Sequence, residues 1–337
     1  MAKKQFDLIT MGRVGMDLFA QNVGAAFEDV TGFETAVGGS PVNIAIGTSR
    51  LGLNSAAFTA VGEDRVGDFV LRYLQNEGVA TDYIPRKPNC RTGLAMVSIQ
   101  PPDQFPLVFY RDNPADTYLT IDDAAALPLT NSRAVQISGT ALSRGSCRDA
   151  MLFVAEQCRA LHVTTFMDLD LRPDQWTHPR AFGLNVRTVL RHLDVVIGTE
   201  EEFYALLAED PAPVWQGDNV TEAQIEEMEE LLQTLLADSQ GPEALVLKRG
   251  PRGVSIFTKT SDVVDAAGFA VEVLNTVGAG DAFASGFIYG YLKGWDWYKS
   301  GRMGNACGAL AVTRHGCATA LPTEQQALNF IEERSGF

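Results

Sequence analysis

Strand-like and helix-like segments alternate through the second half of the chain, and this alternation limits the possible folds more than any other feature. The segments expected to be strands are 134–138, 165–169, 195–198 and 244–247, and the expected helices are 147–161, a segment ending at 192, 200–207 and 222–236. Neighbouring parallel strands must be joined by a crossover, usually a helix. The alternation therefore predicts an α/β fold with a doubly wound, mostly parallel sheet flanked by helices. Ligands of such sheets bind at the carboxyl ends of the strands.

The first third of the chain has a different pattern. Residues 6–10 form an apolar run, expected to be a strand, that leads into a glycine-bearing turn ending at Asp17. Apolar residues at 94–99 and 107–110 are separated by Pro101-Pro102-Asp103, which predicts a β-hairpin with its turn at these three residues. We expect this hairpin and the residues around it to form a small lid over the main sheet.

Composition excludes several classes of protein. The 337 residues carry a formal charge of −15, which argues against a general affinity for nucleic acid or for an anionic membrane. An anionic substrate must therefore be held by local arginines, lysines and backbone amides. Five cysteines without a C-x-x-C pair indicate a reduced, cytoplasmic protein. Neither a signal-type segment nor an apolar stretch of about 18 residues is present in the sequence, so no membrane span is expected.

The stretch Gly278-Ala279-Gly280-Asp281 predicts a tight turn that opens a helix. The first N–H groups of a helix have no internal partner and lie at the positive end of its dipole, so they suit a phosphate group. Asp281 in the first turn could simply complement the dipole. Beside a phosphate site, however, a carboxylate is electrostatically unfavourable unless it accepts a proton from a nucleophile that attacks the phosphate.

A second motif decides between these two interpretations. Gly38-Gly39-Ser40-Pro41-Val42-Asn43, together with the stretch 275–286, resembles the two signatures of the ribokinase-like (pfkB-type) carbohydrate kinases. The resemblance covers essentially the whole chain and implies a single ribokinase-like kinase domain over residues 1–337. It also implies a β lid formed by segments about 14–37 and 92–112, and lids of this family often pair two subunits, so a homodimer is possible.

The family's catalytic roles fall on matching positions. Asp281 resembles the general base that accepts the proton of the attacking alcohol, a step in which positioning should matter more than basicity. The turn of Gly278, Ala279 and Gly280 would stabilise charge on the transferred phosphoryl group. The resemblance implies that four residues face the sugar hydroxyls: Asp17, Gly38, Gly39 and Asn43. Alternatively, Asp17 could be a loop residue that caps a local turn, and Gly38 and Gly39 could form an ordinary turn.

The ATP contacts follow from the same resemblance. Lys248, Gly250 and Gly253 lie in a turn that resembles the family's turn under the nucleotide, and Asn305 falls where the family usually contacts adenine, although it could be a plain helix residue. Thr199 and Glu202 resemble the family's N-x-x-E motif near Mg²⁺, with Thr199 in place of asparagine. Glu202 would act through metal-bound waters, since Mg²⁺ dehydrates reluctantly. In relatives that bind a monovalent cation, an aspartate commonly begins this motif. Asn275 stands at that position here, so the sequence leaves open whether this chain binds such a cation.

Arginines indicate the kind of sugar. Arg111 ends the hairpin and Arg172 follows a strand, while Arg13 lies in the first turn. An arginine fork matches a carboxylate, a group that neutral sugars lack. The segments 110–116 and 168–173 look most like the branch that phosphorylates the terminal hydroxyl of 5-dehydro-2-deoxy-D-gluconate in inositol catabolism. The 2-keto-3-deoxygluconate kinases share these arginines, and each arginine could instead form a surface ion pair, for example with Asp112 or Asp174.

Two readings from other classes remain. A nicotinamide-dependent oxidoreductase would use Gly278–Gly280 as its dinucleotide turn, but that turn should follow the first strand of a βαβ unit. A sugar-acid sensor would have no need of a base at Asp281. We therefore expect an ATP-dependent sugar-acid kinase that uses Mg²⁺ and transfers the phosphoryl group directly.

Overall fold

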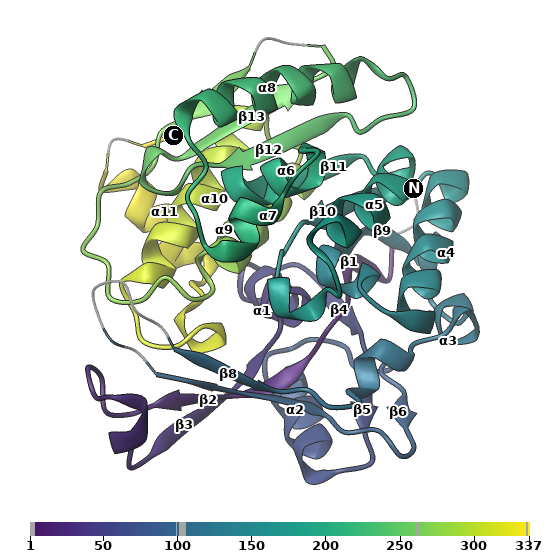
Figure 1. Ribbon diagram of the computed structural model, residues 1–337, viewed down its shortest axis with the longest axis vertical. Coiled ribbons are helices and arrows are strands. Elements are labelled where there is room, and N and C mark those ends of the chain that lie inside the picture. The colour runs from purple at the N-terminus through teal and green to yellow at the C-terminus, as the bar shows by residue number, and fades with distance from the viewer. Residues whose placement is uncertain (1–3, 99, 101–105, 261–262, 335) are drawn as a thin grey trace.

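The computed structural model describes residues 4–98, 100, 106–260, 263–334 and 336–337, which fold around two sheets (Figure 1). The larger sheet has eight strands in the order β14-β13-β12-β11-β10-β9-β1-β4. Its strands are β1 Phe6–Met11, β4 Ser55–Phe58, β9 Ser132–Ser138, β10 Thr164–Asp168, β11 Val195–Thr199, β12 Ala244–Lys248, β13 Val254–Thr258 and β14 Val264–Ala266. The strands from β4 through β1, β9, β10 and β11 to β12 are parallel, as the alternation predicts.

The last two strands were not predicted. Strand β13 pairs antiparallel with β12, and β14 pairs antiparallel with β13. The chain turns back between β12 and β13 through the short 3-10 helix Gly250–Arg252, which leaves no room for a crossover helix. This edge of the sheet is therefore antiparallel.

Helices cover both faces of the larger sheet (Figure 1). They are α1 Ser40–Arg50, α2 Arg65–Asn76, α3 Ile121–Ala125, α4 Gly145–Leu161, α5 Pro179–Val189, α6 Glu200–Leu207, α7 Ala212–Gln216, α8 Glu222–Ala237, α9 Ala279–Leu292, α10 Trp297–Val312 and α11 Glu324–Glu332. Successive strand residues point to opposite faces. Leu8 and Phe166 thus join the core under α1, α9 and α10, while Ile9 and Met167 join the core under α4, α5 and α6. Because both faces are buried, the strands are almost continuously apolar.

A second sheet of four strands has the order β3-β2-β7-β8. Its strands are β2 Gly15–Ala20, β3 Phe33–Gly38, β7 Gly93–Val97 and β8 Leu107–Tyr110, and β5 Val61–Gly62 pairs separately with β6 Arg86–Lys87. Strands β7 and β8 are antiparallel, which confirms the hairpin, whereas its predicted turn at 101–103 lies outside the described residues. Strand β2 begins three residues after β1 ends, so this sheet lies at the carboxyl edge of the larger one.

Asp17 differs from its prediction, because it lies inside β2 and not in a turn. It pairs with Ala36 of β3 and Ala95 of β7, in the middle of the second sheet. The glycine-bearing turn is therefore shorter than expected and ends before Gly15. Among the described residues, no helix combines the length and the apolarity needed to cross a lipid bilayer.

Candidate active site

Helix α9 begins where the sequence predicts, with Gly278 as its N-cap and Asp281 in its first turn. Gly278 has a φ of 84°, in the left-handed region that favours glycine. A Cβ atom at this position would overlap the Cys317 side chain. Only glycine therefore allows the chain to turn so closely into the helix.

The tip of α9 is open to a ligand at its first N–H groups. Ala279 N donates to the Thr276 carbonyl at 3.2 Å, so this amide is already used, in contrast to its predicted part in holding phosphate. The N–H groups of Gly280 and Asp281 have no acceptor in the described part of the chain. A Cβ at Gly280 would lie 3.2 Å from Lys248 Nζ, so the ammonium group faces the same tip. Two free amides and one cation thus converge where an anion can bind.

Asp281 meets Asn43 across the site. Asn43 Nδ2, from the first turn of α1, donates to Asp281 Oδ2 at 2.7 Å, although the two residues are 238 positions apart. Burial raises the pKa of Asp281, and the nearby carboxylate of Asp170 raises it further, while the hydrogen bonds from Asn43 and Ser40 oppose the shift. A carboxylate with a raised pKa, fixed in place by an amide, is suited to accept a proton from an alcohol.

Five of the predicted substrate residues line one hollow on the second sheet, called the first hollow below: Arg13, Asp17, Gly38, Gly39 and Arg111. A Cβ at Gly38 would overlap the Asp17 carboxylate, and one at Gly39 would lie 2.5 Å from the Arg13 carbonyl oxygen. Glycine is therefore required at both positions, because neighbouring atoms lie too close to leave room for a Cβ atom. Burial raises the pKa of Asp17 to about 6, although the cation of Arg13 lowers it and the charge of Asp281 raises it.

The three predicted arginines are held by buried carboxylates. Arg111 Nη2 contacts both carboxylate oxygens of Asp116, at 2.7 and 3.0 Å, and its Nη1 donates to the Val14 carbonyl at 3.2 Å. Arg172 Nη2 lies 3.2 Å from Asp170 Oδ1, and Arg13 Nε lies 3.4 Å from Asp170 Oδ2. The ion-pair partners are thus Asp116 and Asp170. Arg172 is not among the residues that line the hollow.

Asp170 binds more than the two arginines. Its Oδ2 also accepts hydrogen bonds from Ser138 Oγ at 2.9 Å and from Thr140 Oγ1 at 3.1 Å. Burial alone would raise the pKa of Asp170, but Arg13, Arg172 and the Ser138 hydrogen bond together hold it below its usual value. Its backbone has a φ of 37°, an unfavourable region for a residue with a side chain. Asp170 is therefore a positioning residue that fixes both arginines.

Lys248, at the end of β12, is held between two carboxylates, one at the end of β10 and one in the first turn of α6. Its Nζ lies 3.2 Å from Asp168 Oδ2 and 3.7 Å from Glu202 Oε2. Burial alone would lower the pKa of Lys248, but Asp168 and Glu202 together raise it, so it stays an ammonium group. Burial raises the pKa of Asp168, against the effect of Lys248.

Thr199 and Glu202 are engaged in capping α6. Thr199 N donates to Glu202 Oε2 at 2.8 Å, and Glu202 N donates to Thr199 Oγ1 at 3.3 Å, which is a capping box. Glu202 Oε1 also accepts from Leu171 N at 3.0 Å. The two residues thus hold the entry of α6 beside Lys248. Within the described part of the chain, no three His, Cys, Asp or Glu side chains are grouped as direct ligands of a metal.

The other predicted nucleotide residues lie at the antiparallel edge of the large sheet. Gly250 and Gly253 have φ values of 55° and 98°, and a Cβ at Gly253 would overlap the Ala266 carbonyl. Asn305 Nδ2 donates to the carbonyls of Ala266 at 2.8 Å and Ala267 at 3.1 Å. Gly253 and Asn305 therefore meet at the end of β14, and the amide donors of Asn305 are occupied by backbone.

Asn275 is fully buried, and both ends of its amide hold the loop before α9. Its Oδ1 accepts from Val277 N, and its Nδ2 donates to the Gly316 carbonyl, each at 2.9 Å.

Sequence reasoning missed Cys317, whose Sγ accepts from Asn43 Nδ2 at 3.1 Å. Burial and the charge of Asp281 keep the pKa of this thiol well above its usual value, so it is neutral. No motif marks Cys317, whereas Asp168 and Asp170 could have been found from their place at the carboxyl end of a strand.

Comparison with known proteins agrees with this geometry. The model of the pfkB family carbohydrate kinases matches residues 6–324. A 5-dehydro-2-deoxygluconokinase of Geobacillus thermodenitrificans is 34% identical over 331 residues, which are 98% of this chain and 94% of that protein. Among solved structures, a putative ribokinase II from E. coli superimposes with a TM-score of 0.81 at 23% identity, covering 98% of this chain and 100% of that chain. A fructokinase from Xylella fastidiosa with bound ATP gives a TM-score of 0.79 at 25% identity, with 98% and 99% covered. These likenesses confirm the predicted α/β fold.

Proposed function

The chain belongs to the pfkB family of carbohydrate kinases, and from this premise we propose that it phosphorylates the terminal hydroxyl of a sugar acid, 5-dehydro-2-deoxy-D-gluconate, as in inositol catabolism. The enzyme is an ATP-dependent sugar kinase. Support for the acid comes from the names of its relatives at about one-third identity. The observation that carries the proposal is the presence of Arg13 and Arg111 in the same hollow as Asp17, Gly38 and Gly39.

The residues divide the reaction between them. Asn43 orients the Asp281 carboxylate, which takes the proton of the acceptor hydroxyl late, as its oxygen bonds to phosphorus. The free N–H groups of Gly280 and Asp281, with the ammonium of Lys248, stabilise negative charge on the transferred phosphoryl group. Asp17 accepts a hydrogen bond from another sugar hydroxyl.

The donor side fits a phosphate chain with magnesium. The tip of α9 presents the free N–H groups of Gly280 and Asp281, and Lys248 lies beside it. Glu202 and Asp168 are the carboxylates that would hold Mg²⁺ through water, and the ion would neutralise phosphate charge. Thr199 supports Glu202, and Gly250, Gly253 and Asn305 shape the edge proposed to receive the nucleotide.

The substrate is tested by a screen of ATP consumption over sugar acids and neutral sugars, with the phosphate position of the product determined by NMR. We expect the highest kcat/KM with 5-dehydro-2-deoxygluconate and a phosphate on its terminal hydroxyl. A preference for 2-keto-3-deoxygluconate would assign that activity instead, and a preference for neutral sugars would discard the acid. The nicotinamide alternative is not retained, because the family is one of kinases and α9 is followed by helix α10, not by a parallel strand.

We also propose that two subunits associate through the second sheet, in the cytoplasm. Leu107, Val108 and Tyr110 of β8 are exposed on 42%, 40% and 57% of their surface. An exposed apolar edge strand favours association with another chain. Free thiols at all five cysteines fit a reducing compartment.

A further inference from the structure

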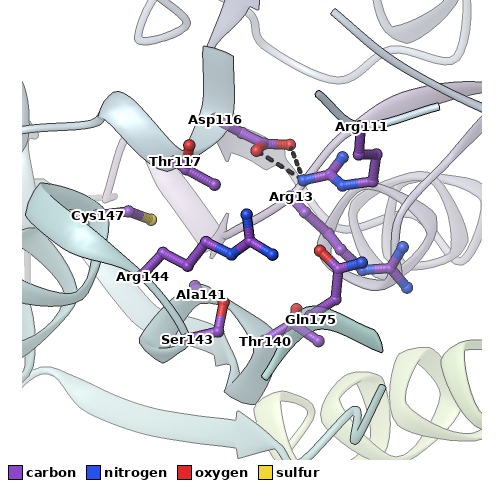
Figure 2. A pocket seen from close by; sticks show the side chains of 10 residues that line it. All are labelled: Arg13, Arg111, Asp116, Thr117, Thr140, Ala141, Ser143, Arg144, Cys147 and Gln175. Atoms are coloured by element: carbon purple, nitrogen blue, oxygen red, sulfur yellow. Dashed lines mark hydrogen bonds and ion pairs between the residues drawn. The ribbon is translucent and has the colours of Figure 1, made fainter. Parts of the chain in front are cut away.

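A second hollow shares two of its lining residues with the first, and Figure 2 shows the side chains that line it. Arg13 and Arg111 line both hollows. The second is completed by Asp116, Thr117, Thr140, Ala141, Ser143, Arg144, Cys147 and Gln175. It contains a third arginine, Arg144, which neither the motifs nor the proposed reaction have used.

Arg144 lies in the turn between β9 and α4, at the carboxyl edge of the large sheet. Its guanidinium group points into the middle of the hollow, between Asp116 and Arg111 on one side and Ser143 and Thr140 on the other (Figure 2). Whereas Arg13 and Arg111 have carboxylate partners, the guanidinium group of Arg144 forms no ion pair or hydrogen bond with any described residue. It directly precedes α4, whose first turn has no side-chain cap. An unpaired cation and an uncapped helix tip thus lie side by side.

Arg144 is exposed, so water can satisfy its guanidinium group, and the sign of a missing ligand comes from Arg111. Its side chain is only 8% exposed, and its Nε atom is buried without a hydrogen-bond partner. The Asp116 carboxylate occupies only the Nη2 edge of the guanidinium group. A buried donor without an acceptor is destabilising, so an acceptor brought by a ligand would be stabilising here.

The charges of the second hollow favour an anion. Three guanidinium groups line it, and Asp116 is the only carboxylate among its lining residues. Burial raises the pKa of the Cys147 thiol, which is therefore neutral. This excess of positive charge occurs in a chain with a net charge of −15. Uncharged hydrogen-bonding groups complete the lining: Thr117, Thr140, Ser143 and Gln175. Planar guanidinium forks with hydroxyl groups beside them match a carboxylate.

We propose, on the premise of the proposed function, that the second hollow binds the carboxylate end of the acceptor and that Arg144 is its specificity-determining residue. The hydroxyl end of the same molecule lies in the first hollow, toward Asp281. Arg13 and Arg111, which line both hollows, complete the set of guanidinium groups around that carboxylate. Arg144 binds the acid without touching the reacting atoms, so its effect falls on KM for acids.

The test compares Arg144→Ala with a matched control, Arg148→Ala. Arg148 lies one turn further along α4, pairs with Asp149 and does not line the hollow. A charge-assisted hydrogen bond of about 1.5–3 kcal/mol corresponds to about 10- to 100-fold in binding. We expect Arg144→Ala to raise KM for the best sugar acid by that factor. Its kcat with the acid, and its kcat/KM with a neutral sugar, should stay within about twofold of the unaltered enzyme. Arg148→Ala should change none of these quantities. Arg144→Lys, which keeps the charge but loses the fork, should recover part of the loss.

A binding measurement separates the subsite from turnover and from folding. Calorimetry with the same sugar acid and no nucleotide should show the same loss of affinity for Arg144→Ala, with an unchanged melting temperature. Equal losses for acid and neutral sugars, or no loss for either, would overturn the assignment of Arg144. The proposed function fails separately if the unaltered enzyme prefers neutral sugars. If it prefers acids and Arg144→Ala keeps that preference, only the subsite is wrong.

Discussion

At the scale of single residues, the proposed chemistry depends most on Asp281. Its carboxylate is fixed by Asn43 at 2.7 Å and lies in the first turn of α9, beside amides that can hold a phosphate group. Asn43 affects both the position and the proton affinity of the group, because its hydrogen bond orients the carboxylate and opposes the rise in pKa that burial and Asp170 cause. A substitution that keeps the shape but removes the proton acceptor separates these two properties.

Asp281→Asn should reduce kcat by about 10²-fold or more while nucleotide binding stays nearly intact, because general-base catalysis contributes about 10²–10⁴-fold. Steady-state kinetics gives the first quantity and calorimetric titration with ATP gives the second. An unchanged kcat would remove Asp281 from its role. A loss of ATP binding equal to the loss of turnover would instead assign it to the nucleotide.

The raised pKa of Asp17 predicts how the activity depends on pH. Burial raises its pKa to about 6, and a sugar hydroxyl donates to the ionised form, so activity should fall as the pH drops through about 6. The acidic limb of kcat/KM, which reports the free enzyme, should therefore lie well above the ordinary carboxylate range near 4. In Asp17→Asn this limb should change position, and the acidic limb that remains reports Asp281, whose pKa burial also raises. A wild-type profile that stays flat down to about 4 would contradict the prediction.

The sequence predicted some residues of the site better than others. Asn43 and Asp281 belong to motifs, and the structure brings them into contact as the carboxyl-edge rule implies. The partner of Arg111 was not predictable, because Asp112 lies next to it while the fold selects Asp116, which also accepts from Val14 N. Local sequence does not show which carboxylate is buried. Distances in sequence are a poor guide to ion pairs for that reason.

At the scale of elements, α9 depends on glycine at its entry. Gly278 has a positive φ and no room for a Cβ, since Cys317 fills that space. Gly294, just past the other end of α9, has a φ of 77° but nothing within 4 Å of the Cβ position. A comparison of alanine substitutions at the two glycines therefore separates the cost of the backbone conformation from the cost of a steric overlap.

Gly278→Ala should lower the free energy of unfolding more than Gly294→Ala. A left-handed backbone costs a residue with a Cβ about 1–2 kcal/mol at either position, and overpacking adds about 1–3 kcal/mol at Gly278 alone. Urea denaturation of both variants measures the difference. Equal losses would show that the contact with Cys317 relaxes freely.

Elements with long periodic patterns were predicted well, and short ones were not. Helix α6, Glu200–Leu207, has the predicted bounds, since its first turn carries its own capping box. Strands β13 and β14 are short and connected by turns, so no helix marks their place in the order. Their antiparallel pairing arises from the turn at Gly250–Arg252, which the sequence marks only as glycine-rich.

At the scale of the whole molecule, the second sheet has one face toward the first hollow and exposes side chains of its edge strand on the other. Phe109 lines the first hollow, and successive strand residues point to opposite sides, so Val108 and Tyr110 face away from it. These outward side chains form the surface through which we propose that two subunits associate.

Val108→Lys should shift the protein from dimer to monomer in sedimentation experiments, because a buried unpaired ammonium group is costly at an interface. Val263→Lys is the control, since Val263 is similarly exposed, at 37% against 40%, but lies at the far edge of the large sheet, just before β14. A wild-type protein that sediments as a monomer, or variants that behave alike, would exclude this surface.

The connection between the sheets has a consequence for how two substrates meet. Strand β2 follows β1 after residues 12–14, where Val14 N donates to Asp116 and the Val14 carbonyl accepts from Arg111. The small sheet carries Asp17 and Gly38, whereas the large sheet and its helices carry Asp281 and Lys248. The proposed sugar and nucleotide sites thus lie on two sheets that are joined at residues 12–14, between β1 and β2, and again at Gly39, between β3 and α1. Their alignment depends on the angle between the sheets at these connections, and neither sheet alone can set it.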